Sequence, residues 1–282
     1  MGDVLITSRR NSLVRRLRAL STRAGRESER CLLLEGTHLL DECLSQGLRL
    51  KEVICTDAWK ARNPRLVQRC GSNLTWHRVT DEVLGAALTT VTPDGVACLC
   101  PLNQLPLPAV DVEFALVLDR IQDPGNLGTL LRTALAADVE TVWLGAGADP
   151  LSPKVLRASA GALLQLPHER FGPSEDSALV QLEDQLTRLS SAGVQVVATL
   201  VPDAEGPLQA IPYWQLDWTR PTALVLGTEG AGLHSRLQAC CTHAVTLPHS
   251  PRVESLNVAA AAVPLLLERR RATMTATSQQ SG

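Results

Sequence analysis

The segment FALVLDRIQDPGNLGTLLR occupies residues 114–132 and joins three local signals. Its apolar start, Phe114–Leu118, predicts a buried parallel strand, since both faces of such a strand are covered. The turn DPGN contains residues that adopt turn geometry and cap helices, with Asn126 as the expected cap of a following helix. Ligands bind at the carboxyl ends of strands in open α/β sheets. Asn126 and Arg132 are therefore expected near a polar or anionic group, although an ordinary strand–turn–helix with a solvated arginine has the same pattern.

Strand and helix patterns alternate through the second half of the chain. The predicted strands are Phe114–Leu118, Thr141–Leu144, Val194–Leu200, Ala223–Leu226 and Ala244–Leu247. The predicted helices are Leu127–Ala137, Pro153–Leu164, Glu175–Ala192, Leu233–Cys240 and Leu256–Arg271. Several of these strands are near-continuous apolar runs, which predicts an α/β fold with a doubly wound parallel sheet covered on both faces.

The first hundred residues alternate in the same way. The predicted helices are Asn11–Leu20, Thr37–Gln46, Pro64–Cys70 and Asp81–Leu88, and the predicted strands are Cys31–Leu34, Lys51–Thr56, Leu74–His77 and Gly95–Cys100. Three prolines between Pro101 and Pro108 indicate an extended linker. We therefore predict an α/β domain over residues 1–100, a linker over 101–112, a second α/β domain over 113–272 and a disordered polar tail over 273–282.

The net charge of −2 conceals an asymmetry between the two halves. Residues 1–110 contain 15 Lys and Arg against 11 Asp and Glu, whereas residues 111–282 contain 12 against 18. The basic excess is concentrated in eight arginines before residue 31. Clustered arginines favour a phosphate-binding face, although a solvated helix surface has the same composition. Aromatic residues make up only 3% of the chain, which argues against base stacking on exposed rings.

Several classes of protein are disfavoured by composition. The N-terminus lacks the apolar run of a signal peptide, and the apolar stretch Leu256–Leu267 is too short to span a bilayer. Eight cysteines occur without a CxxC pair, which indicates reduced thiols, and the six histidines form no ligand-spaced cluster. We expect a cytoplasmic protein with no membrane association and no metal.

Three further segments of the second half carry unusual local chemistry. They are SPKVLRASAG at residues 152–161, LGTEGAGL at 226–233 and LPHSPRVESLNV at 247–258. The glycines of the second segment predict close approach of the backbone to a ligand. Their spacing is neither the dinucleotide fingerprint nor a Walker loop, which disfavours a nucleotide-dependent oxidoreductase. Glu229 within it has two interpretations, an ion-pair partner or a surface charge.

Taken in chain order, these segments resemble the motifs of the SpoU-type (TrmH-like) RNA 2′-O-ribose methyltransferases of the SPOUT class. The first motif matches residues 123–134, the second 226–233 and the third 247–258. The segments ITSRRN at residues 6–11 and LLEG at 33–36 resemble the RNA substrate-binding domain, a ribosomal-protein-like fold, that precedes the catalytic domain in many members. Thr228 and His249 depart from the residues common in the family.

The resemblance implies a SPOUT domain with a deep trefoil knot, whose loops bind S-adenosylmethionine. The residues implied to bind this cofactor are Leu200, Val201, Gly227, Glu229, Gly232, Leu247 and Leu256. The residues implied to be catalytic are Arg132, Asn126, Glu229, Ser255 and Asn257. The family assigns the proton acceptor to the first-motif arginine, here Arg132. Because arginine is always protonated and has no acceptor, it is either a base of strongly lowered proton affinity or an electrostatic stabiliser.

The resemblance also implies RNA as the substrate and a homodimer that pairs through the helices of the knot region. The residues implied to bind RNA are Arg9, Arg10, Asn11, Arg15, Glu35 and Arg157. The extra N-terminal domain favours 23S rRNA as the target, with tRNA as the alternative. A non-catalytic RNA-binding assembly factor of the same fold is a second alternative, which the joint presence of all five catalytic residues disfavours.

Overall fold

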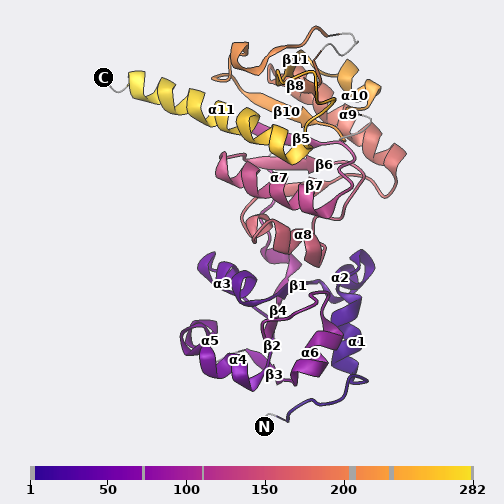
Figure 1. Ribbon diagram of the computed structural model, residues 1–282, viewed down its shortest axis with the longest axis vertical. Helices are drawn as coiled ribbons and strands as arrows, with labels where there is room; N and C mark the ends of the chain where they lie inside the picture. The colour runs from indigo at the N-terminus through magenta and orange to yellow at the C-terminus, as the bar shows by residue number, and fades with distance from the viewer. Residues whose placement is uncertain (1–3, 72–73, 110, 203–207, 229–231, 281–282) are drawn as a thin grey trace. The chain divides into compact units, whose positions relative to one another are not determined.

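The computed structural model describes residues 4–71, 74–109, 111–202, 208–228 and 232–280. The chain divides into two compact units (Figure 1). Unit 1 comprises residues 1–106 and the segment Asp149–Gln165, and unit 2 comprises residues 107–148 and 166–282. The sequence assigned Asp149–Gln165 to the second domain, whereas the structure packs this segment with the first hundred residues.

Unit 1 contains a four-stranded sheet in the order β1-β4-β2-β3, in which β2 and β3 are parallel and the other pairs antiparallel. The strands are β1 (Cys31–Glu35), β2 (Glu52–Cys55), β3 (Thr75–Arg78) and β4 (Val96–Pro101). The helices are α1 (Ser12–Ala19), α2 (Arg23–Glu29), α3 (Thr37–Ser45), α4 (Asp57–Arg62), α5 (Pro64–Cys70), α6 (Asp81–Ala87) and α8 (Pro153–Ala158), with short 3₁₀ turns η1 (Leu102–Gln104) and η2 (Ala162–Leu164). All strands and helices predicted here are present. The short helices α2 and α4 were missed.

Helix α1 illustrates how the local sequence determines where a helix of unit 1 begins and which of its faces is buried. Asn11 caps the helix by accepting the Leu13 N–H at 2.9 Å. Leu13, Leu17 and Leu20 are buried in a cluster with residues of β2 and β4. The amphipathic pattern therefore decided which side of α1 faces the sheet.

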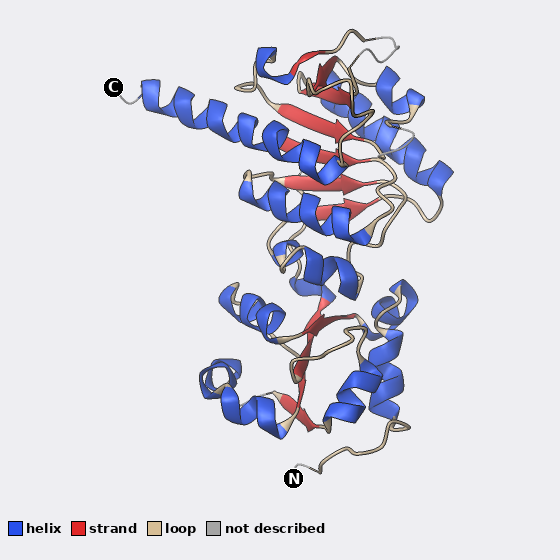
Figure 2. Cartoon of the chain, viewed as in Figure 1, coloured by secondary structure: helices blue, strands red, loops and turns tan. Residues whose placement is uncertain are grey.

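Unit 2 is built on a central β-sheet (Figure 2). Its seven strands follow the order β7-β6-β5-β10-β8-β11-β9, and all neighbouring strands are parallel. The strands are β5 (Phe114–Leu118), β6 (Thr141–Leu144), β7 (His168–Arg170), β8 (Gln195–Leu200), β9 (Ile211–Pro212), β10 (Thr222–Leu226) and β11 (His243–Thr246). The five predicted strands are confirmed, and the two short edge strands β7 and β9 were missed. The position of β10 between β5 and β8 requires crossing connections; the threading that would make a knot stays a prediction.

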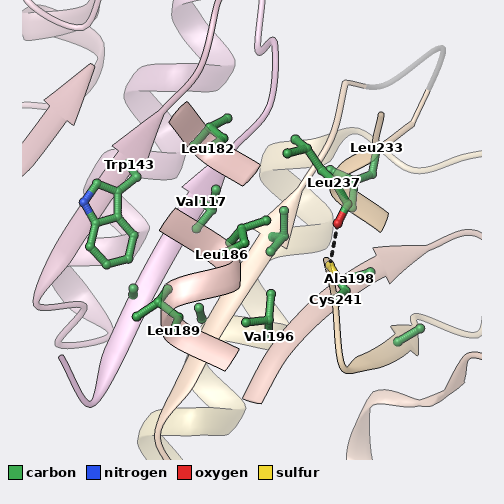
Figure 3. Close-up of a cluster of buried hydrophobic side chains, with 14 of the residues drawn as sticks. Val117, Trp143, Leu182, Leu186, Leu189, Val196, Ala198, Leu233, Leu237 and Cys241 are labelled. Carbon is green, nitrogen blue, oxygen red and sulfur yellow. Dashed lines mark hydrogen bonds between the residues drawn. The ribbon is translucent and has the colours of Figure 1, made fainter. Parts of the chain in front are cut away.

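Helices cover both faces of this sheet. They are α7 (Pro124–Ala136), α9 (Glu175–Ser191), α10 (Ser235–Ala239) and α11 (Val258–Gln280), and η3 (Tyr213–Gln215) follows β9. Leu182, Leu186 and Leu189 of α9 pack into a buried cluster with Val117 and Val196 of the sheet (Figure 3). Helices α7 and α11 pack against each other on the opposite face (Figure 1).

Two local predictions in unit 2 were wrong. Asp123, not Asn126, caps α7, because Pro124 takes the first helical position and the Asp123 carboxylate accepts the Asn126 N–H at 2.8 Å. Asn126 therefore lies in the first turn of the helix. The predicted disordered tail is also wrong up to Gln280, since α11 continues to that residue. After Pro264 the chain contains no further proline, and its alanines and arginines are good helix formers.

Two expectations about composition can be compared with the structure. The eight cysteines are free thiols, six of them buried, in agreement with the reduced state inferred from the sequence. Within the described residues, no helix has both the length and the apolar character needed to cross a membrane.

Candidate active site

A cavity of about 400 Å³ lies at the carboxyl ends of β8, β10 and β11, beside the start of α11. Six of the residues expected to bind the cofactor line it: Leu200, Val201, Gly227, Gly232, Leu247 and Leu256. These residues come from three separate segments, which the parallel strands bring to the same edge of the sheet. Glu229, the seventh, lies outside the described residues.

The glycine-rich segment forms a tight loop on one wall of the cavity. The Gly232 N–H donates to the Thr228 carbonyl at 2.9 Å, which closes the loop on itself. A Cβ on Gly227 would lie 2.3 Å from the backbone nitrogen of Leu233, so only glycine permits this approach. Gly232 has a φ of +67°, a conformation that also favours glycine. The sequence predicted that the backbone at these glycines approaches a ligand. In the structure, the close approach is between backbone atoms of Gly227 and Leu233.

The third motif forms the facing wall and leads into α11. Ser255 is exposed on the cavity wall, together with Leu256. Asn257 stands directly before α11, where its side-chain oxygen accepts the Ala260 N–H at 3.1 Å. Its amide nitrogen donates to the side-chain oxygen of Asn126 at 3.0 Å. The structure therefore brings the first and third motifs into direct contact.

Arg132 lies apart from this contact. It is six residues beyond Asn126 on α7, which corresponds to a rise of roughly 9 Å along the helix. Its side chain is exposed, and its guanidinium makes no hydrogen bond or ion pair within the part of the chain described. It is not among the described residues that line the cavity. A single chain therefore presents Arg132 on the outer surface of α7.

The residues of the cavity fit a ligand that is apolar on its faces and polar at its edges. Leucine and valine side chains form much of the wall, while the loop after Leu226 presents backbone groups. Thr199 also lines the cavity, although its hydroxyl is buried. The walls thus match what S-adenosylmethionine requires.

The cavity wall also includes the polar side chains of Gln238, His249 and Glu254, of which the sequence had singled out only His249, as a departure from the family. His249 and Glu254 belong to the third motif, so the motif itself could have indicated them. Gln238 comes from α10, and its amide donates to the Leu233 carbonyl at 2.8 Å. No local pattern singles out that glutamine. Among the described residues, no group of three or more His, Cys, Asp or Glu side chains is placed to hold a metal ion.

The residues expected to bind RNA separate into two groups in unit 1. Arg9, Arg10 and Arg15 are exposed, and Arg9 lies 3.7 Å from Glu82. Asn11 is engaged as the cap of α1. The exposed arginines of this group are available to a polyanion.

Glu35 and Arg157 form the second group, and they bind each other. The Glu35 side chain is 1% exposed and is paired with the Arg157 guanidinium. The same carboxylate accepts the backbone N–H groups of Thr89 at 2.8 Å and Thr90 at 3.1 Å. This burial contradicts a direct contact of Glu35 with RNA, because its acceptors are occupied inside the unit. Arg157 remains 31% exposed.

Comparison with known proteins gives a family match for each half of the chain. The SpoU rRNA Methylase family matches residues 113–266, and the MRM3-like substrate binding domain matches residues 11–98. An uncharacterized tRNA/rRNA methyltransferase of Synechocystis is 43% identical over 269 residues, covering 94% of this chain and 93% of its own length. The 23S rRNA (guanosine(2553)-2′-O)-methyltransferase RlmP of Bacillus subtilis is 30% identical over 266 residues, covering 94% and 98%.

Solved structures give the same result over the whole chain. A crystal structure of an RNA 2′-O ribose methyltransferase has a TM-score of 0.76 at 29% identity, covering 96% of this chain and 100% of that one. The AdoMet-bound rRNA methyltransferase from Sinorhizobium meliloti has a TM-score of 0.77 at 27% identity, covering 96% and 98%. Together with the family match over residues 113–266, these likenesses show that the chain belongs to the SpoU rRNA methylase family.

Proposed function

We propose that the protein methylates a ribose 2′-hydroxyl in 23S rRNA with S-adenosylmethionine as the methyl donor. The observation that carries the proposal is the joining of the second and third motifs around one cavity, with the first motif linked to the third by the hydrogen bond between Asn126 and Asn257. The related RlmP of Bacillus subtilis is a 23S rRNA 2′-O-methyltransferase that covers nearly the whole chain, which favours the same class of substrate. A cytoplasmic location follows from such a substrate.

The cavity residues would hold the cofactor. When bound, S-adenosylmethionine supplies a methyl group activated by the adjacent positive sulfur. Leu200, Leu247 and Leu256 would cover the apolar faces of the ligand, and the backbone after Leu226 would bind its polar edge. Glu229 and Gly232 belong to the same loop, and we include both in the cofactor site.

The nucleophile is the oxygen of a neutral hydroxyl, which needs its developing negative charge stabilised. We assign this role to Arg132, because a guanidinium offers five donors and no acceptor. Arg132 would bind the ribose oxygen or the neighbouring phosphate, while the Asn126–Asn257 pair and Ser255 orient the sugar. Glu229 would hold the arginine or the substrate. The hydroxyl proton then leaves to an acceptor other than Arg132. Two side chains on the cavity wall, His249 and Glu254, are candidates for this acceptor.

We further propose a homodimer in which Arg132 acts on the cavity of the second subunit. Two observations support this arrangement. Arg132 is exposed and unpaired within the described residues, and α11, which packs on α7, exposes Val263 and Leu267, 38% and 41% accessible. Pairing through α7 and α11 would cover these apolar side chains and carry Arg132 to another cavity.

Mixing two impaired variants tests this arrangement. Arg132→Ala and Asn257→Ala, each impaired alone, should regain activity when their subunits are exchanged, because a mixed dimer contains one site with both residues intact. If the arginine acts within its own chain, the mixed dimer has no intact site and activity stays at the level of the separate variants. Sedimentation of each variant checks that the dimer itself is preserved.

Transfer of a radiolabelled methyl group to RNA tests the reaction and its target. Protein incubated with labelled S-adenosylmethionine should label 23S rRNA at a ribose 2′-oxygen. Labelling of tRNA instead would establish the alternative substrate. Binding of rRNA without any labelling, under conditions where the Bacillus subtilis relative is active, would establish the alternative of a non-catalytic assembly factor. Absence of both labelling and RNA binding would overturn the proposal.

A further inference from the structure

Asp119 directly follows strand β5, four residues before the first motif begins, and carries a buried charge outside the cavity. Its side chain is 3% exposed, and its backbone N–H donates to the Leu226 carbonyl at 2.9 Å. That hydrogen bond places the ends of β5 and β10 side by side, where the glycine-rich loop begins. No step of the proposed reaction uses Asp119, so its burial needs another explanation.

The Asp119 carboxylate is bound from two directions. One oxygen accepts the backbone N–H of His234 at 3.0 Å. Both oxygens accept hydrogen bonds from the guanidinium of Arg120, at 3.1 Å from Nε and 3.1 Å from Nη2. Arg120 in turn donates from Nη2 to the Gly232 carbonyl at 3.5 Å. The two side chains therefore hold the backbone on each side of Leu233.

Gly232 and Leu233 also line the cofactor cavity. Their loop contains three glycines, which have the greatest backbone freedom of any residue, so an ordered conformation needs an external restraint. Leu233 provides one anchor through its burial in the core. Asp119 and Arg120 provide a polar anchor on the side of the loop that faces away from β11 and the third motif.

The backbone conformation of Arg120 is energetically unfavourable, which indicates that the contacts around it maintain it. Its φ is +53°, in the left-handed region that non-glycine residues rarely adopt. Such conformations persist where the surrounding contacts enforce them, and they cluster at ligand sites. In this conformation the Arg120 guanidinium turns back onto the neighbouring carboxylate. Glu175 at the start of α9 is 3.9 Å from the same guanidinium.

We propose that Asp119 and Arg120 are positioning residues that hold the backbone of residues 232–234 in the shape required for cofactor binding. The inference rests on the proposed function, since it takes the ligand of the cavity to be S-adenosylmethionine. Neither residue touches the reacting atoms. Their effect is on the conformation of the cavity wall and hence on the free energy of binding.

Hydrogen exchange and calorimetry test this role together. In Asp119→Ala and Arg120→Ala, the amide of His234 should exchange faster in the cofactor-free protein, and the Kd for S-adenosylmethionine should rise about tenfold or more, the effect of losing a hydrogen bond to a charged group. The value of kcat at saturating cofactor should stay within a few-fold of the wild type. Arg120→Lys should recover part of the affinity, because it keeps the charge beside Asp119.

Arg170→Ala is the matched control. Arg170 also donates to a glycine carbonyl in unit 2, that of Gly147 at 2.9 Å, but Gly147 does not line the cavity. Its substitution should leave the cofactor Kd unchanged. Faster exchange at His234 with an unchanged Kd in both alanine variants would show a merely structural contact and overturn the inference.

Two other outcomes are also decisive. If Asp119→Ala does not fold, the comparison of Arg120→Ala with Arg120→Lys decides the question by the same criteria. If the wild type binds no S-adenosylmethionine, the proposed function fails, and the exchange rate at His234 still shows whether the two residues order the loop.

Discussion

The side-chain amide of Asn257 donates a 3.0 Å hydrogen bond to the side-chain oxygen of Asn126, across 131 positions of sequence. The contact joins the first turn of α7 to the residue that precedes α11. Each asparagine is thereby oriented by the other, and Asn257 lies between Leu256 and Val258, which line the cavity. The pair is thus the direct link between the first and third motifs.

Alanine at either asparagine should lower turnover without unfolding the protein. We expect kcat to fall at least about tenfold in Asn126→Ala and Asn257→Ala, since each change removes an orienting hydrogen bond near the reacting sugar. The double variant should be little worse than either single variant, because both changes remove the same contact. Methyl-transfer kinetics at saturating cofactor measure this coupling. Fully additive losses would show that the two residues act independently.

Removal of the Arg132 side chain should affect chemistry rather than cofactor binding. Arg132→Ala is expected to lower kcat by about 10²-fold or more, in the range measured when a donor to a developing oxyanion is lost. The Kd for S-adenosylmethionine should stay within a few-fold, because Arg132 is absent from the described cavity wall. Arg132→Lys keeps the charge but loses the bidentate hydrogen bonding of a guanidinium, and it should recover only part of the activity. Wild-type turnover in the alanine variant would refute the mechanism.

A methyl group added at Gly227 should close the cavity locally. In Gly227→Ala the new Cβ would lie 2.3 Å from the Leu233 nitrogen and 2.4 Å from the Gly232 carbonyl carbon, so the loop must move. We expect cofactor affinity to fall below detection by calorimetry. Gly85→Ala is the control, because nothing lies within 4 Å of its Cβ position in α6. That change should raise stability by about 0.4–1 kcal/mol and leave binding intact.

Only part of the N-terminal arginine cluster should contribute to RNA affinity. Arg10→Ala and Arg15→Ala, at exposed positions, should weaken RNA binding and each lower the slope of log K against log salt by about 1. Arg26→Ala should leave that slope unchanged, because Arg26 is 2% exposed and paired with Asp149 inside unit 1. Titrations at several salt concentrations measure the slopes. A wild-type slope in the Arg10 and Arg15 variants would show that the cluster does not contact phosphate.

The acid stability of unit 1 should depend on Glu52. Burial alone would raise the pKa of Glu52, but its hydrogen bonds with Arg16 and His77, and their charges, outweigh burial and hold the pKa below its ordinary value. The Glu52 carboxylate therefore takes up its proton at a lower pH in the folded protein than in the unfolded chain. The resulting stability is complete above the ordinary glutamate pKa of about 4.3 and is lost as the pH falls through the lowered value.

Glu52→Gln should accordingly reduce the free energy of unfolding by about 2 kcal/mol at pH 7, the scale of hydrogen bonds to a charged group. The difference from the wild type should shrink below about pH 4, where the carboxylate of the unfolded chain takes up its proton. Glu27→Gln is the control, because its pair with Arg23 is exposed on both sides and should contribute little. Urea unfolding across the acid range up to neutral pH provides the measurement. A difference that does not change with pH would contradict the assignment to the ionised carboxylate.

The amino-acid sequence alone was sufficient for most of the elements and for the motifs. Phe114–Leu118 was predicted as a strand with the observed bounds, and a helix was predicted over Asn11–Leu20, where α1 lies, because apolar periodicity acts within a few residues. The three motif segments were also identifiable from sequence, because the residue types that bind a ligand or permit close backbone approach are themselves local features.

Tertiary structure decided which of these local features meet. The hydrogen bond between Asn126 and Asn257 and the burial of Glu35 against Arg157 each join residues more than one hundred positions apart, and the segment Asp149–Gln165 packs with unit 1 despite its distance in sequence. Such contacts depend on strand order and on the packing within each unit, which local propensity does not encode. The sequence therefore determined the parts and their chemistry, whereas long-range packing determined the geometry of the site.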